Sequence, residues 1–180
     1  GQPDEIAIID LLNLDGTAVH LIYVGPCHQT GDTLIHVPSE GVVFTGDVIF
    51  HECTPMGWNG SYEKWMKNLD FIISLKPKVI VPGHGPVCGV EGVVQMKAYL
   101  EYVRGEAMRC FGLGMSALDA SKKIDFGPYA EWRAPARIFM NVERAYREFR
   151  NEAGDAPWDH AKTFDAIYHV AKARGRHLEF

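Results

Sequence analysis

Three short segments of the chain each place a side chain that can bind a metal ion next to glycine residues. They are YVGPCHQTGDT with His28, VVFTGDVIF with Asp47 and VIVPGHGPV with His84. Imidazole nitrogen and carboxylate oxygen are ordinary zinc ligands at about 2 Å, and neighbouring glycines let the backbone approach an ion closely. The three residues lie 19 and 37 positions apart, which suits ligands on different strands of one sheet. The pattern therefore predicts a metal site built from two histidines and one carboxylate.

Each histidine taken alone has a simpler explanation, because a single histidine on a loop is ordinarily a polar surface residue. The joint pattern of three side chains at glycine-rich strand ends favours metal binding. A small interaction module without a metal is the alternative from another class. It predicts that His28→Ala, Asp47→Ala and His84→Ala leave the melting temperature and partner binding unchanged.

The first half of the chain is rich in strand signals. Asp15-Gly16 separates two aliphatic runs, and glycine takes a positive φ at little cost, so an antiparallel hairpin is expected there. Apolar residues at spacings of three and four after Ser61 predict an amphipathic helix that ends before Lys76-Pro77. Strands are expected over 5–14, 17–24, 33–37, 42–47 and 78–81, and helices over 61–75, 91–111, 115–123, 135–151 and 159–174.

Length and composition predict one domain in two parts. The 180 residues are 47% hydrophobic, enough for a sizeable core. Residues 1–100 are expected to form the sheet and helices that carry the metal ligands, and 101–180 a helical extension packed on them. In that extension, the stripe of Phe139, Val142, Tyr146 and Phe149 is interpreted as core packing.

Charge and cysteine content limit the classes of partner. The net charge of -5 comes without a cluster of Lys and Arg, which argues against nucleic acid. The longest apolar runs are too short to cross a bilayer, so no membrane partner is expected. The four cysteines lie far apart without a C-x-x-C pair, which favours reduced thiols in the cytoplasm.

A family resemblance rests on three motifs: H-x-x-G-D-T at residues 28–33, T-G-D at 45–47 and P-G-H-G-P at 82–86. From about Leu21 to Val87 the chain resembles the second half of the metallo-β-lactamase superfamily, the fold shared by glyoxalase II and many metal-dependent hydrolases. The resemblance implies an α/β fold, the C-terminal half of an αββα sandwich with an antiparallel-rich sheet and flanking helices, followed by a helical tail. It also implies that His28 binds a first metal, His84 binds a second, and Asp47 bridges both and positions the nucleophilic water.

The function that the resemblance implies is metal-dependent hydrolysis of a small molecule. A metal-bound hydroxide would attack an ester, thioester, lactone or amide. Asp47 stands where one subgroup of β-lactamases has Cys, which is similar to the glyoxalase II side of the family. Zinc is expected, as one or two ions, and iron or manganese suits the same ligands. His51, Thr54 and Trp58 follow Asp47 and form the candidate substrate loop.

The chain departs from the family pattern in its first half. The family's H-x-H-x-D-H segment is absent, and no two of the eight histidines are spaced H-x-H. With three of seven ligands, binding or rate is expected to fall by several powers of ten, at about 10- to 100-fold for each loss. An isolated half would also leave one sheet face bare. The alternative is therefore a metal-binding half-domain with little catalysis, completed by a homodimer partner or by a missing N-terminal half.

Overall fold

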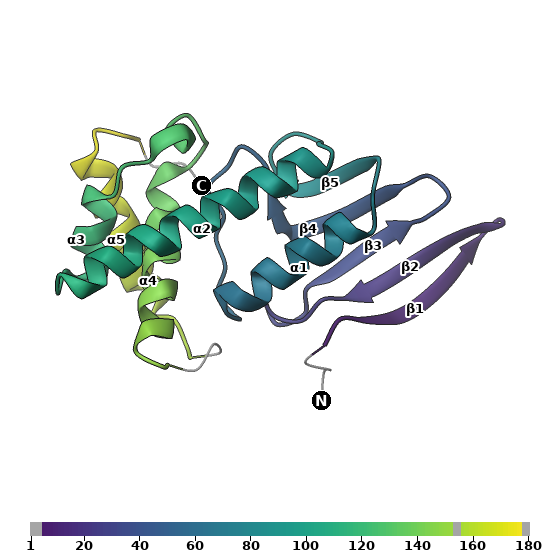
Figure 1. Cartoon of the computed structure of the whole chain (residues 1–180), viewed down its shortest axis with the longest axis horizontal. Helices are drawn as coiled ribbons and strands as arrows, with labels where there is room; N and C mark the ends of the chain where they lie inside the picture. The colour runs from purple at the N-terminus through teal and green to yellow at the C-terminus, as the bar shows by residue number, and fades with distance from the viewer. Residues whose placement is uncertain (1–4, 153–155, 178–180) are drawn as a thin grey trace.

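A computed structural model describes residues 5–152 and 156–177, and its centre is one five-stranded sheet. The strands follow one another in space as they do in sequence: β1 (Ala7–Leu14), β2 (Thr17–Tyr23), β3 (Thr33–Val37), β4 (Val42–Phe50) and β5 (Val79–His84). The first four are antiparallel, and β5 runs parallel to β4. The α/β fold with an antiparallel-rich sheet, expected from the sequence, is confirmed (Figure 1).

Turn chemistry forms the first hairpin as expected. Asp15 and Gly16 have φ values of 50° and 90°, the left-handed conformations that a two-residue hairpin turn requires. The strands on either side pair from Leu14 with Thr17 to Ala7 with Tyr23.

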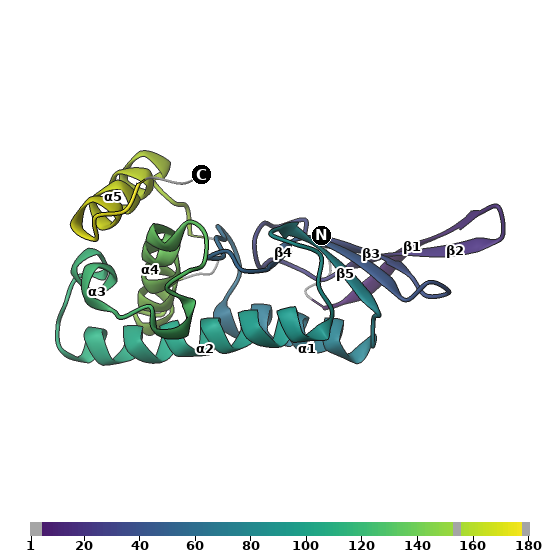
Figure 2. The ribbon, with the colours of Figure 1, turned by 90° about the horizontal axis from the view of Figure 1, so that it is seen from above.

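Helices α1 (Tyr62–Ser74) and α2 (Val90–Gly112) pack on one face of the sheet, and Figure 2 shows that both lie on the same side. The side chain of Ser61 caps α1 by accepting a hydrogen bond from Lys64 N at 3.1 Å, which satisfies one of the free amides of the first turn. The apolar stripe predicted from the sequence is fully buried at Trp65, Leu69 and Ile72. It lies in one core with the sheet residues Leu34, Val43 and Ile80.

The remaining helices form a cluster at the far end of α2, beyond the sheet (Figures 1 and 2). They are α3 (Ala117–Lys123), the short helices η1 (Gly127–Tyr129) and η2 (Pro135–Arg137), α4 (Ile138–Phe149) and α5 (His160–Ala173). The α2 helix continues through residues 100 and 101, so one helix belongs both to the sheet part and to the helical extension. Within the described ranges, no helix has both the length and the apolar composition that crossing a bilayer requires.

Two strands are longer than the sequence predicted. Strand β4 continues past Asp47 to Phe50, and β5 includes His84 as its last residue. The expectation that a strand ends at Asp47 is therefore wrong, and so is the placement of His84 on a turn after a strand over 78–81. The β4–β5 register is irregular around Gly46, whose φ is 49°. Such an irregularity redirects a side chain without ending the strand, and here it precedes Asp47.

The sheet face opposite α1 and α2 carries a row of apolar side chains. Leu21, Ile35, Phe44 and Val81 are neighbours across four strands, so they point to the same side. Ile35 is 41% exposed and Phe44 is 43% exposed. In the part of the chain that the structure describes, no helix covers this face (Figure 2).

Candidate metal centre

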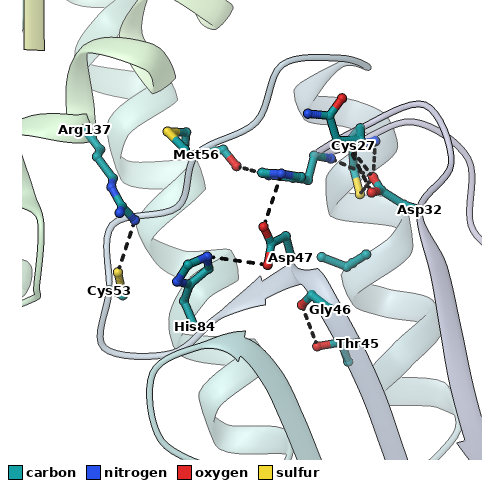
Figure 3. A network of polar contacts seen from close by, with 12 residues as sticks. Cys27, Asp32, Thr45, Gly46, Asp47, Cys53, Met56, His84 and Arg137 are labelled. Carbon is teal, nitrogen blue, oxygen red and sulfur yellow. Dashed lines mark hydrogen bonds and ion pairs between the residues drawn. The ribbon is translucent and has the colours of Figure 1, made fainter. Parts of the chain in front are cut away.

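The structure brings His28, Asp47 and His84 together from three different parts of the chain. His28 Nε2 lies 3.2 Å from Asp47 Oδ2, and His84 Nε2 lies 3.5 Å from Asp47 Oδ1. The two imidazoles therefore approach the two oxygens of a single carboxylate (Figure 3). The side chain of His28 is largely buried, whereas those of Asp47 and His84 are partly exposed. The expected meeting of the three side chains is present, and solvent reaches it.

A backbone carbonyl sets the orientation of the His28 ring. His28 Nδ1 lies 2.6 Å from the carbonyl oxygen of Met56, and because a carbonyl can only accept, Nδ1 must carry a proton. Nε2 then faces a carboxylate oxygen, which also accepts. Either a second proton or a metal ion must therefore lie between Nε2 and Asp47. A histidine that binds metal through one nitrogen commonly donates the other N–H to a backbone carbonyl in this way.

The loop that carries His28 is organised by Asp32. One oxygen of this carboxylate, Oδ2, accepts from the backbone amides of Cys27 at 2.9 Å, His28 at 2.7 Å and Gln29 at 3.0 Å. These bonds hold three successive amides around one point, so Asp32 organises this turn. Burial, followed by the charge of Asp32, raises the pKa of the Cys27 thiol well above its usual value, so Cys27 stays protonated.

The glycines on either side of His84 allow two close approaches. A Cβ on Gly83 would lie 2.1 Å from Asp47 Oδ1, and one on Gly85 would lie 1.7 Å from the carbonyl oxygen of His51. Larger residues would therefore separate this turn from Asp47 and from the chain that follows β4. The His84 ring also stacks on Phe50, with centroids 4.8 Å apart and planes at 9°. Close backbone packing and one aromatic contact thus fix His84.

The donor set of two imidazoles and one carboxylate is the chemistry that zinc prefers. In the described ranges 5–152 and 156–177, no three His, Cys, Asp or Glu side chains already surround a common point as metal ligands do. His28 and His84 contact Asp47 directly instead. The three side chains fit a metal by donor type and by the His28 orientation.

The candidate substrate loop makes contacts of three kinds. His51 Nδ1 lies 3.0 Å from the carbonyl oxygen of Pro86, at the turn before α2. Thr54 is only 2% exposed, and its amide donates to Arg133 O at 3.0 Å. Trp58 stacks on His160 with centroids 4.4 Å apart. In this structure Thr54 therefore does not face solvent, and Trp58 packs against the first residue of α5.

Two contacts of the His28 loop were not foreseen from the sequence. One is the Met56 carbonyl, because backbone acceptors leave no signal in residue types. The other is Arg144 of α4, which donates to the carbonyl of Cys27 at 2.9 Å. Burial lowers the pKa of the Arg144 guanidinium, and the residue is only 4% exposed. In the sequence, Arg144 is a basic residue within a strongly amphipathic segment. That pattern ordinarily indicates a solvent-facing side chain.

Residues 2–84 match the family model described as the metallo-beta-lactamase superfamily. Among curated proteins, the chain is 30% identical over 77 residues to the 2,4-dinitroanisole O-demethylase subunit alpha of Nocardioides sp. (strain JS1661), which covers 41% of this chain and 23% of that protein. It is 29% identical over 91 residues to the metallo-beta-lactamase type 2 of Bacteroides fragilis, covering 48% and 36%. It is 37% identical over 73 residues to the beta-lactamase-like protein 2 homolog of Drosophila melanogaster, covering 41% and 24%.

Solved structures extend the likeness beyond residue 84. The metallo-beta-lactamase family protein TTHA1429 from Thermus thermophilus aligns with 81% of this chain and 48% of its own, with a TM-score of 0.58 and 17% identity. The sec-alkylsulfatase Pisa1 from Pseudomonas sp. aligns with 78% of this chain and 25% of its own, with a TM-score of 0.59 and 14% identity. These likenesses show a shared fold. The alignments span less than half the length of each of these relatives and solved structures.

Proposed function

We propose that this chain belongs to the metallo-β-lactamase superfamily, whose family model residues 2–84 match, and that it is the metal-binding part of a metal-dependent hydrolase. The observation that carries the proposal is the convergence of His28 Nε2 and His84 Nε2 on the two oxygens of Asp47. The hydrogen bond from His28 Nδ1 to Met56 supports it, because that bond turns Nε2 toward Asp47 as a metal ligand requires.

The proposed metal is zinc, as one or two ions held by His28, Asp47 and His84, and iron or manganese would suit the same ligands. A bound ion would supply Lewis-acid polarisation of a carbonyl and would make a nearby water more acidic. Asp47 is the residue that would orient this water and accept its proton, because its carboxylate lies between both histidines and is partly exposed. His28 and His84 would hold the ion.

The proposed substrate is a small molecule with an ester, thioester, lactone or amide bond. The superfamily supports the reaction class, while one fold hosts many chemistries. The segment 51–58 follows β4 and is the candidate substrate loop, with His51 and Trp58 as the side chains of the predicted set that are not buried.

The test measures zinc content by elemental analysis on protein purified without added metal, together with hydrolysis of p-nitrophenyl acetate and of a thioester. We expect metal on the wild-type chain and hydrolysis that a chelator abolishes and added zinc restores. His84→Ala should lose both. His169→Ala is the matched control, since His169 lies on α5 and pairs with Asp165 of the same helix at 3.5 Å. Chelator-resistant hydrolysis, or no bound metal at all, would reject the proposal.

A second candidate is a metal-binding half-domain with little catalysis, completed by a second copy or by an N-terminal half. The apolar row on the uncovered sheet face favours it, since Ile35 and Phe44 are each more than 40% exposed and contiguous apolar surface commonly marks an interface. The absent H-x-H-x-D-H segment supports it as well. Native mass with and without chelator, measured beside the hydrolysis rate, separates the two candidates. An inactive, metal-free monomer would reject both.

A further inference from the structure

The α4 helix carries a second stripe, which is polar and buried. Arg137, immediately before the helix, is followed by Asn141, Arg144 and Glu148 at spacings of four, three and four residues, so these side chains share one helix face. Arg137, Asn141 and Arg144 are each less than 9% exposed. A polar stripe on an amphipathic helix ordinarily faces water, so its burial calls for partners.

The partners of this stripe lie mainly in the segment between Asp47 and the first turn of α1. Arg137 donates to Cys53 Sγ at 3.6 Å, and Asn141 donates to the carbonyl of Pro55 at 3.0 Å. Glu148 accepts a hydrogen bond from the amide of Tyr62. The helix therefore contacts the chain before and after Met56, the residue whose carbonyl orients His28. Figure 3 shows the contact of Arg137 with Cys53 near Met56.

Arg144 lies at the centre of the stripe and contacts both loops of the site. Its Nη1 donates to the carbonyl of Cys27 at 2.9 Å. The amide of the same peptide group, His28 N, donates to Asp32 at 2.7 Å, so the peptide that leads into His28 is held from both sides. On the other loop, Nη2 of Arg144 lies 2.8 Å from where a Cβ on Gly57 would be. One guanidinium thus packs between the Cys27–His28 backbone and the Met56–Trp58 backbone.

We propose that Arg144 is a positioning residue that holds the His28 loop against the Met56–Trp58 segment, so that His28 Nε2 faces Asp47. This inference rests on the proposed function. Two further bonds join these loops: His28 Nδ1 with Met56 O at 2.6 Å, and Trp58 N with His28 O at 2.7 Å. Both require the two backbones to stay in register. Arg144 contacts both backbones and holds them in these relative positions.

Packing alone does not account for an arginine at this position. Within the described residues no Asp or Glu lies at ion-pair distance from its guanidinium, which rests over the Trp65 ring at 5.1 Å. Its Nη2 also has no hydrogen-bond partner there. A buried cation without a carboxylate partner destabilises a fold, and an apolar side chain of similar length commonly serves stability better. The contacts of Arg144 with the two loops therefore explain the presence of an arginine here.

The test compares Arg144→Met with Arg104→Met. Arg104 is a matched control because it lies on α2, half-exposed, and pairs with Glu148 at 3.6 Å away from the His28 loop. Amide hydrogen exchange of Trp58, measured on metal-free protein, reports the joint between the loops directly. We expect exchange at least about 10-fold faster in Arg144→Met, with the amides of β3 unchanged. Zinc affinity, from competition with a chromophoric chelator, should fall about 10- to 100-fold, as for other residues that orient metal ligands.

Unchanged exchange at Trp58 in folded Arg144→Met would overturn the positioning role. So would a zinc affinity equal to that of Arg104→Met. The exchange measurement needs no metal, so it distinguishes this inference from the proposed function. A wild-type chain that binds no zinc rejects the proposed function, and exchange alone then decides whether Arg144 holds the loops together.

A second variant separates the loops without replacing Arg144. In Gly57→Ala the new Cβ would meet Cys27 O at 2.7 Å, Arg144 Nη2 at 2.8 Å and Trp65 Cζ3 at 2.9 Å. It should raise exchange at Trp58 as Arg144→Met does, and it decides the question if Arg144→Met does not fold. Gly105→Ala is its control, because a Cβ there meets nothing within 4 Å. Equal Trp58 exchange in Gly57→Ala and Gly105→Ala would contradict the inference.

Discussion

Asp47→Asn is the substitution that separates a metal site from an ordinary ion pair. Asparagine keeps the shape of the side chain but removes the charge that faces His28 at 3.2 Å and His84 at 3.5 Å. Without metal, these contacts are partly exposed and each contributes no more than about 1 kcal/mol. The free energy of unfolding of metal-free Asp47→Asn should therefore lie close to that of the wild type.

The proposed zinc binding changes the comparison, because a ligand that binds only the folded chain raises the free energy of unfolding. At a free zinc concentration about 100 times the dissociation constant, binding adds about 2.7 kcal/mol to the free energy of unfolding. If the loss of the ligand Asp47 weakens affinity at least about 100-fold, the upper end of the range for residues that only orient a ligand, the same zinc concentration adds no more than about 0.4 kcal/mol. The variant should therefore lose most of the zinc effect while retaining most of its metal-free stability.

Urea unfolding, followed by tryptophan fluorescence in chelator and in buffered zinc, measures both quantities for the wild type and for Asp47→Asn. An equal zinc-induced increase in the two proteins would show that Asp47 is no ligand. A wild type whose stability does not respond to zinc would refute the reasoning altogether.

Three further predictions concern groups outside the metal centre. Gly60→Ala should lower the free energy of unfolding by about 1–3 kcal/mol, measured by urea unfolding, because Gly60 has a φ of 73° and a Cβ there would lie 1.9 Å from Pro26 O. Burial, and then the charge of His20, lower the pKa of His36 below 6.5. The contribution of His36 to the free energy of unfolding is therefore complete above about pH 6.5 and is lost as the pH falls toward the folded pKa. Between about pH 7.5 and 5.5, the free energy of unfolding should fall less in His36→Leu than in the wild type. All four cysteines are buried thiols, and burial raises the pKa of Cys88 to about 11, so the folded chain should react with a thiol reagent far more slowly than the unfolded chain.

Local signals in the sequence sufficed for most of the fold. The hairpin at Asp15-Gly16 follows from turn chemistry, and α1 follows from its Ser61 cap and apolar spacing. The convergence of His28, Asp47 and His84 was also foreseen, because strands that are neighbours in one sheet bring distant residues together. These features depend on residue type and spacing, which a sequence displays.

The features that the sequence did not predict depend on tertiary contacts. Strand β4 continues past Asp47 because the chain pairs with β5 as far as Phe50 and His84, although Gly46 suggested an end to the strand. Nothing in the sequence indicated that the polar stripe of α4 is buried, because its partners lie about 80 to 120 positions earlier in the chain. The Met56 carbonyl that orients His28 is a backbone group, and no residue type reveals it.

X-ray absorption spectroscopy of the zinc-loaded chain tests the central claim most directly, because it counts the atoms around the ion. If His28, Asp47 and His84 hold the metal, the first shell contains only nitrogen and oxygen at about 2.0–2.2 Å, with the outer scattering of two imidazoles, and His84→Ala removes one of them. A sulfur shell at about 2.3 Å, or a spectrum without imidazole scattering, would contradict the account.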